Sequence, residues 1–185
     1  MTKFSELIEP GVEFKTLGEG MSWTEGPLWL ADRQSCIFSD IHNNAIMAWS
    51  EPKQTMSVFA NNVEFTNGRA IDGNGDIIEC SHGRRAVQRR SASTGEVTVL
   101  VDHFAGVSLN SPNDVVVASD GAIWFSDPAY GIELAGEGHP GVREYGDRWI
   151  FRFDESTGQI WPVVTDVIAP NGLAFSPDES VLFVC

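Results

Sequence analysis

The stretch NDVVVASDGAIWFS, residues 113–126, contains two short apolar runs separated by a turn. The runs Val115–Ala118 and Ala122–Ser126 are rich in β-branched and aromatic residues, which favour half-buried strands. Between them, Ser119-Asp120-Gly121 is a turn signal. The stretch therefore predicts a β-hairpin that follows directly on the dipeptide Asn113-Asp114.

The same arrangement recurs four times along the chain. A dipeptide of one kind opens each copy, and an apolar strand follows 10 residues later in three copies and 12 residues later in the first. Successive dipeptides are 42, 46 and 58 residues apart. A period of this length in an all-β chain is typical of β-propeller blades, each of which is a four-stranded sheet. The dipeptides are Glu25-Gly26, Asn67-Gly68, Asn113-Asp114 and Asn171-Gly172.

The repeat predicts a single partial β-propeller domain over residues 1–185. We expect blades over residues 23–60, 65–101, 111–164 and 169–185, the last with two strands. An outermost strand is expected over residues 12–17. In propellers such a strand closes the ring by joining the last blade. That last blade is missing and the sequence ends within an apolar strand, so we expect a fragment of a longer chain, about its first three and a half blades. The alternative is a four-bladed ring, because an open ring would expose strand edges.

Composition and charge exclude several classes of protein. The 185 residues are 42% hydrophobic and 21% charged, which suits a chain with a buried core. The net charge of −14 repels phosphate backbones and anionic lipids, so neither nucleic acid nor a membrane is an expected partner. No apolar run approaches the roughly 20 residues of a spanning helix. Because Glu6 and Glu9 interrupt the N-terminal stretch where a signal peptide is apolar, we expect a cytoplasmic protein.

The first residues of the four dipeptides form the candidate site. Corresponding residues of a repeat occupy corresponding places, so Glu25, Asn67, Asn113 and Asn171 are expected to converge around one axis. One carboxylate and several amide oxygens are hard ligands of the kind that hold Ca²⁺ or a similar cation. The alternative is that the dipeptides are only turns, which such pairs often form. Their placement in phase with the repeat favours the site.

Longer motifs surround these dipeptides. They are TEGPLW (residues 24–29), TNGR (66–69), LNSPNDV (109–115), IWFSDPAYG (123–131) and PNGL (170–173). With them the chain resembles, over about residues 10–185, the gluconolactonase/senescence-marker-protein (regucalcin)-like family of six-bladed propellers. The Ser-Pro-Asn-Asp-Val motif followed by an aromatic Asp-Pro-x-Tyr-Gly is the most specific part of the resemblance.

The resemblance implies a divalent-metal-dependent lactonase, a hydrolase of cyclic esters whose small-molecule substrate is a sugar-acid lactone such as gluconolactone. It implies one divalent cation, with Ca²⁺ first and Zn²⁺, Mn²⁺ or Mg²⁺ as alternatives. The implied metal ligands are Glu25, Asn113 and Asn171, and the implied substrate-binding residues are Asn67 and Asn113. The family's catalytic aspartate comes from the fifth blade, so it is expected beyond Cys185 and no catalytic base is assigned within this chain.

Two other functions remain open for such a chain. The same architecture can hydrolyse other esters or organophosphates, because pocket side chains choose the substrate. A propeller can also bind Ca²⁺ or protein partners without catalysis, since a fold does not fix a function. The converging oxygen ligands favour the two hydrolase hypotheses.

A long loop, a cluster of arginines, and the histidines and cysteines are given mainly structural interpretations. Residues 127–148 are expected to form a loop on a blade rim, either a substrate lid or plain surface. The basic cluster Arg84-Arg85 with Arg89-Arg90 is expected on a solvated strand edge, with an acidic-sugar site as the alternative. Metal-ligand spacing is lacking among the histidines, and the cysteines are expected in the core. These are His42, His82, His103 and His139, and Cys36, Cys80 and Cys185.

Overall fold

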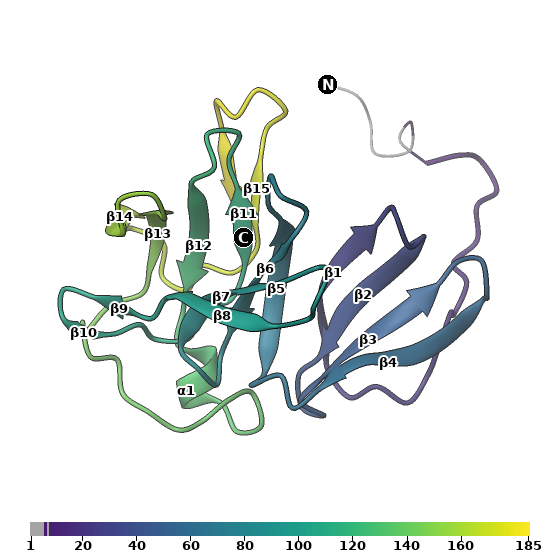
Figure 1. The fold of residues 1–185 in the computed structure, drawn as a ribbon, viewed down its shortest axis with the longest axis horizontal. Helices are drawn as coiled ribbons and strands as arrows, with labels where there is room; N and C mark the ends of the chain where they lie inside the picture. The colour runs from purple at the N-terminus through teal and green to yellow at the C-terminus, as the bar shows by residue number, and fades with distance from the viewer. Residues whose placement is uncertain (1–5, 7) are drawn as a thin grey trace.

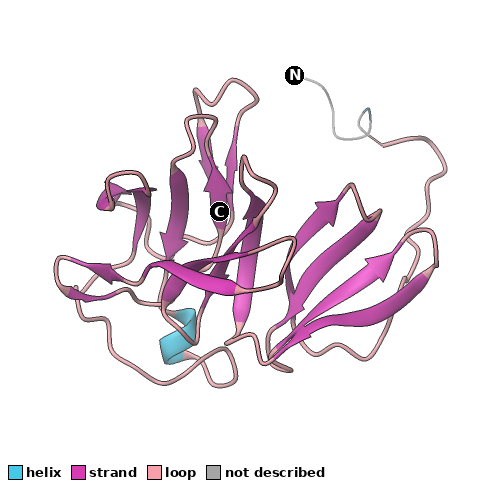
Figure 2. Ribbon diagram, viewed as in Figure 1, coloured by secondary structure: helices cyan, strands magenta, loops and turns pink. Residues whose placement is uncertain are grey.

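The structure, a computed structural model, describes residue 6 and residues 8–185. Strands dominate these residues, and the α-helix among them, α1 (Tyr130–Glu133), is four residues long (Figure 2). No helix in the described part of the chain has the length and apolar character of a membrane span. The prediction that Met1–Glu9 is not a signal peptide concerns a segment that lies mostly outside the described residues.

Within residues 8–185 the strands form three four-stranded antiparallel sheets, each with its strands in chain order. The first sheet contains β1 (Thr24–Leu30), β2 (Ser35–Asp40), β3 (Ala45–Ser50) and β4 (Thr55–Asn61). The second contains β5 (Thr66–Ile71), β6 (Ile77–Ser81), β7 (Ala86–Arg90) and β8 (Val97–Val101). The third contains β11 (Val115–Val117), β12 (Ile123–Asp127), β13 (Trp149–Asp154) and β14 (Gln159–Val164).

Two two-stranded sheets complete the described strands. The hairpin of β9 (His103–Phe104) and β10 (Val107–Ser108) connects the second and third sheets along the chain. The pair β15 (Leu173–Phe175) and β16 (Leu182–Val184) follows the third sheet.

The first strand of each sheet lies beside the first strand of the next. β1 contacts β5, β5 contacts β11, and β11 contacts β15. Figure 1 shows the three four-stranded sheets in chain order across the view, from β1–β4 on the right to β11–β14 on the left. This radial succession of antiparallel sheets confirms the predicted all-β propeller fold.

Glycines of the dipeptides allow these inner strands to approach each other. A Cβ atom on Gly26, whose φ is +54°, would lie 2.2 Å from the backbone oxygen of Asn67. A Cβ atom on Gly68 would lie 2.7 Å from the backbone oxygen of Asn113, to which the Gly68 N–H donates a hydrogen bond of 2.7 Å. Only glycine permits this backbone contact, so these positions have a packing role in addition to any turn.

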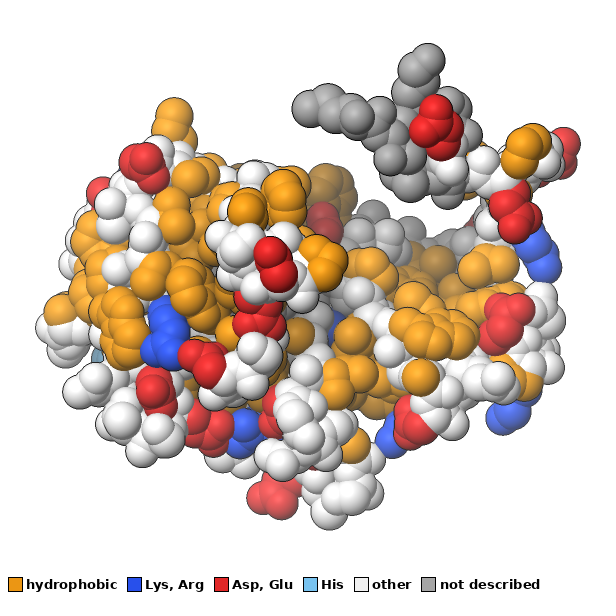
Figure 3. Space-filling view, turned by 90° about the horizontal axis from the view of Figure 1, so that it is seen from above, with side chains coloured by type: hydrophobic (Ala, Val, Ile, Leu, Met, Phe, Trp, Pro, Cys, Tyr) orange, Lys and Arg blue, Asp and Glu red, His pale blue; other side chains and the backbone are white. Residues whose placement is uncertain are grey.

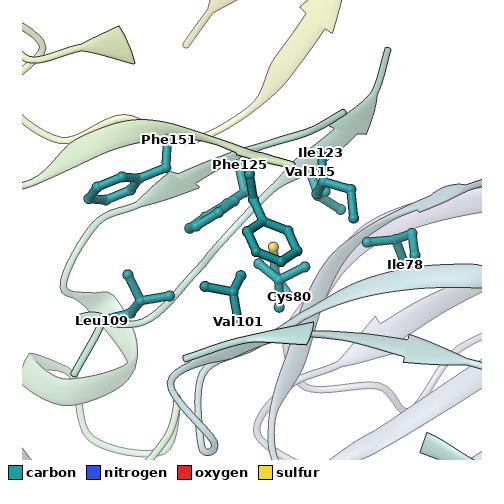
Figure 4. Packing of buried hydrophobic residues seen from close by; sticks show 10 residues of the cluster. Ile78, Cys80, Val101, Leu109, Val115, Ile123, Phe125 and Phe151 are labelled. Carbon is teal, nitrogen blue, oxygen red and sulfur yellow. The ribbon is translucent and has the colours of Figure 1, made fainter. Parts of the chain in front are cut away.

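Apolar side chains fill the spaces between neighbouring sheets. The rings of Phe125 and Phe151, both from the third sheet, stack with centroids 5.5 Å apart, and side chains of the second sheet point toward them (Figure 4). A second cluster joins the first and second sheets. Burial of each large side chain contributes about 1.5–3 kcal/mol, so these clusters fix the relative positions of the sheets. The second cluster contains Leu30, Ile37, Ile46, Val63 and Ile77.

Residues 12–17 pair with none of the described strands, and the ring-closing strand predicted there stays a prediction because its partner was expected in a blade beyond Cys185. This described segment belongs to none of the sheets, and Val12, Phe14 and Leu17 are exposed. A strand requires hydrogen bonds to a neighbouring edge, and no described strand pairs with it. Apolar side chains also reach the surface elsewhere, as the face in Figure 3 shows.

The cysteine and arginine interpretations are only partly right. All three cysteines are free; Cys80 is buried as expected, Cys36 is half-buried and Cys185 is exposed. The solvated-edge interpretation is wrong for Arg90, whose Nε lies 2.8 Å from a carboxylate oxygen of the fully buried Glu79. Arg90 lies on the same face of β7 as Gln88, which also contacts Glu79, and this carboxylate compensates the charge of the buried arginine.

Candidate functional site

The structure brings the four in-phase side chains together. Glu25, Asn67, Asn113 and Asn171 all line a cavity of about 130 Å³. The same four residues also line a second cavity of about 420 Å³ that is bounded by β1, β5, β11 and β15. The four side chains therefore lie where the two cavities meet, on the shared axis of the sheets. We call the smaller space the axial cavity.

Irregularities in the pairing of β1 and β5 orient the side chains of Glu25 and Asn67. Glu25 lies in β1 and Asn67 lies in β5, each beside a shift in strand register. The shifts fall between Glu25 and Leu28 and between Thr66 and Arg69. A bulge of this kind turns a side chain away from the regular alternation of a strand. This turn lets Glu25 and Asn67 face the axial cavity from strands of different sheets.

Hydrogen bonds hold the other two residues just before their strands. The Asn113 N–H donates to the backbone oxygen of Ser126 at 2.9 Å, and the Asn171 N–H donates to that of Cys185 at 2.8 Å. The Ser126 hydroxyl donates to the backbone oxygen of Asn171 at 2.7 Å. Ser126 thus connects the two segments that bring Asn113 and Asn171 to the cavity.

The loop between β12 and β13 forms one wall of the axial cavity. Tyr130, Leu134 and Glu137 line it from this loop, and Trp23 lines it from the segment before β1. Burial raises the pKa of the Glu137 carboxyl, and the negative charge of Glu25 adds to this rise. The position of the loop favours the covering role over plain surface. The sequence did not single out Trp23 or Glu137 because no motif distinguishes them from other loop residues.

His82 lies behind the cavity and is fully buried. Its Nδ1 is 2.9 Å from the backbone oxygen of Glu137, and its Nε2 is 3.4 Å from the side-chain nitrogens of both Asn67 and Asn113. Burial lowers the pKa of His82 to about 4, so the ring is neutral at neutral pH. These contacts span 15, 31 and 55 residues, so no spacing rule could have revealed them.

The donor set of the axial cavity fits a hard divalent cation. Within the described residues no group of three or more His, Cys, Asp or Glu side chains is arranged to hold a metal, so a cation here depends on amide oxygens. Asn67 and Asn113 direct their amide nitrogens at His82, which leaves each amide oxygen at the opposite end of the group. With the Glu25 carboxylate and the Asn171 amide, the cavity offers one charged and several neutral oxygen donors.

Known proteins resemble this chain in sequence and in structure. The family model described as SMP-30/Gluconolactonase/LRE-like region matches residues 23–185. The gluconolactonase of Zymomonas mobilis is 29% identical over 201 residues, which cover all of this chain and 55% of that protein. The structure of a gluconolactonase from Xanthomonas campestris is 38% identical with a TM-score of 0.86, covering 91% of this chain and 56% of that one.

A second similar structure extends the fold comparison. The calcium-binding protein regucalcin from Agrobacterium tumefaciens matches with a TM-score of 0.67 at 18% identity, over 91% of this chain and 52% of that one. Similarity at this level of identity concerns the fold alone. The chain spans little more than half the length of the relatives that it matches.

Proposed function

Because this chain belongs to the SMP-30/Gluconolactonase/LRE-like family, we propose that the protein is a hydrolase that opens the ring ester of a sugar-acid lactone such as gluconolactone. The observation that carries the proposal is the convergence of one carboxylate and three amides on the axial cavity. The gluconolactonases that resemble the chain support this choice of substrate class.

We propose that Glu25, Asn113 and Asn171 hold one divalent cation, with Ca²⁺ as the first candidate and Zn²⁺, Mn²⁺ and Mg²⁺ as alternatives. One carboxylate and two neutral amides leave part of the cation's charge uncompensated. When bound, such a cation polarises an ester carbonyl and lowers the pKa of bound water. Glu25 is then a ligand rather than a base, because a carboxylate that binds a cation accepts a proton poorly.

The remaining side chains of the axial cavity bind and orient the lactone. Asn67 and Asn113 offer amide oxygens to the hydroxyl groups of a sugar ring. Trp23, whose side chain is half exposed, offers an aromatic face to the apolar side of the ring. Tyr130 and Glu137 cover the bound substrate from the loop and exclude bulk water. The proton-accepting carboxylate is proposed to be the aspartate that the family resemblance places after Cys185.

The proposal is tested by lactone hydrolysis with the intact protein in a pH-stat, in the presence and absence of Ca²⁺. Glu25→Gln removes the charged ligand and Asn171→Ala removes an amide oxygen. Each change should lower kcat/KM by more than the roughly 10- to 100-fold that loss of a group supporting a ligand costs.

Matched controls exchange the same residue types at exposed sites away from the cavity. Glu96→Gln, before β8, and Asn74→Ala, in the turn between β5 and β6, should hydrolyse the lactone at the wild-type rate. Wild-type turnover in both Glu25→Gln and Asn171→Ala would refute the proposal. Cation binding without any lactone hydrolysis would instead support the non-enzymatic function.

A further inference from the structure

His82 occupies a tightly packed position between the loop and the inner strands. It follows β6, and its side chain has no exposed surface. The loop approaches it so closely that a Cβ atom on Gly131 would lie 2.5 Å from the His82 Cβ. The orientation of the imidazole is therefore fixed by packing on the side of the loop.

The partner of Nδ1 determines which nitrogen of the ring carries the proton. Nδ1 lies 2.9 Å from the backbone oxygen of Glu137, which can only accept a hydrogen bond. Nδ1 must then be the donor. The second nitrogen, Nε2, faces two amide nitrogens, which can only donate, so Nε2 carries a lone pair and acts as an acceptor.

The lone pair of Nε2 faces two side-chain amides. The amide nitrogens of Asn67 and Asn113 both lie 3.4 Å from Nε2, so the two N–H groups share one acceptor. If either amide were turned by 180°, its oxygen would face the lone pair, and two acceptors would repel each other at a buried position. The ring thus selects one of the two orientations of each amide.

From this arrangement we propose that His82 is a positioning residue, whose Nδ1–H ring turns the amides of Asn67 and Asn113 so that both amide oxygens face the axial cavity. The nitrogen and oxygen lie on opposite branches of a planar amide, so holding the nitrogen at His82 directs the oxygen away from it. The Glu137 carbonyl in turn fixes the ring. One side chain therefore couples the position of the loop to the orientation of two amides from different sheets.

The consequence for binding rests on the proposed function. A cation requires the oxygen of an amide, and a turned amide would present N–H groups that repel it. His82 does not contact the cation or the lactone in this scheme, and it acts only through Asn67 and Asn113. Groups that orient ligands in this way typically contribute 10- to 100-fold to metal affinity.

The first test measures the tautomer and does not depend on catalysis or metal binding. In the intact protein labelled with ¹⁵N-histidine, long-range ¹H–¹⁵N correlation spectra distinguish a protonated Nδ1 from a protonated Nε2. His82, identified by the signals missing from His82→Gln, should show a protonated Nδ1 and an unprotonated Nε2. A protonated Nε2 at neutral pH would overturn the proposal, whether or not the protein hydrolyses lactones.

The second test compares variants that place a side-chain amide at the position of Nε2 or at the position of Nδ1. In His82→Gln the side-chain amide reaches the position of Nε2 and supplies an acceptor there, whereas in His82→Asn it reaches only the position of Nδ1. Calorimetric titration of the intact protein with Ca²⁺ should give an affinity about 10- to 100-fold below wild type for His82→Asn. His82→Gln should recover most of this loss.

Controls keep the outcome specific to the site. The same two exchanges at His103, an exposed residue of β9 that pairs with Asp102, should leave the affinity for Ca²⁺ unchanged. Wild-type affinity in His82→Asn, or an equal loss in both His82 variants, would overturn the proposal. If the wild type itself binds no Ca²⁺, the proposed function fails, and the tautomer measurement alone decides the role of His82.

Discussion

The buried carboxyl of Asp127 holds in place the segment that leads to Asn113 in the candidate site. Its two oxygens accept hydrogen bonds of 2.8 Å from the backbone N–H groups of Asn110 and Ser111, and one also accepts the Tyr145 hydroxyl at 2.8 Å. These contacts hold the segment just before Asn113. The Asp-Pro-x-Tyr-Gly motif therefore has a positioning role that the sequence alone did not indicate.

The burial of Asp127 predicts a pH dependence of stability. Burial raises its pKa to about 7 in the folded chain, whereas the value in an unfolded chain is near 3.9. Between these values the folded state holds a proton that the unfolded state releases. The resulting stability is fully present below about pH 4 and is lost as the pH rises through about 7, with a slope of up to about 1.4 kcal/mol per pH unit.

Asp127→Asn should remove this slope and also lower the free energy of unfolding by about 1–3 kcal/mol, because one backbone donor loses its acceptor. Urea unfolding of the intact protein between pH 5 and pH 7 measures both effects. Asp166→Asn, at an exposed position, serves as the control and should keep the wild-type slope. An identical pH dependence in Asp127→Asn and the wild type would show that Asp127 does not hold the proton.

Among the elements, the loop of residues 128–148 is anchored to its neighbours by Arg85. The Nε of Arg85 donates to the backbone oxygens of Leu109 and Asn110, at 2.6 and 3.1 Å. Its terminal nitrogens donate to the Glu144 carboxylate at 3.0 Å and the Val142 backbone oxygen at 3.1 Å. One guanidinium thus joins the loop to the segment before β11, and the loop is held over the axial cavity by fixed contacts.

Arg85→Ala should free the loop while leaving the sheets folded. We expect faster proteolytic cleavage within residues 134–148 and faster amide exchange there, because the variant loses an ion pair and three backbone contacts. Limited proteolysis followed by mass spectrometry measures the effect. Arg33→Ala removes an exposed arginine that bonds the Ala92 backbone oxygen far from this loop, and it should be cleaved like the wild type. Equal cleavage of both variants would contradict the anchoring role.

The elements also show what the sequence could predict. The in-phase dipeptides and their hairpins predicted the propeller, because strands and turns are encoded by residues that are neighbours in the sequence. The ring-closing strand at residues 12–17 stays a prediction, because the blade with which it was expected to pair lies outside residues 8–185. The contacts of His82 and Arg85 could not be predicted, since each depends on residues brought close only by the packing of sheets.

On the scale of the whole molecule, the radial packing of sheets creates the site. β1, β5 and the segments just before β11 and β15 each bring one polar side chain to a common axis, while apolar clusters between the sheets fix their spacing. Neither a single sheet nor a single motif contains a binding site. The site is therefore a product of geometry: residues from four separate segments line one cavity, where we propose that a divalent cation binds.

The most direct measurement is a crystal structure of the intact protein grown with Ca²⁺, with the ion located from its anomalous signal. We expect one ion in the axial cavity, about 2.3–2.6 Å from oxygens of Glu25, Asn113 and Asn171. An empty axial cavity at saturating Ca²⁺, or an ion bound only elsewhere, would contradict it.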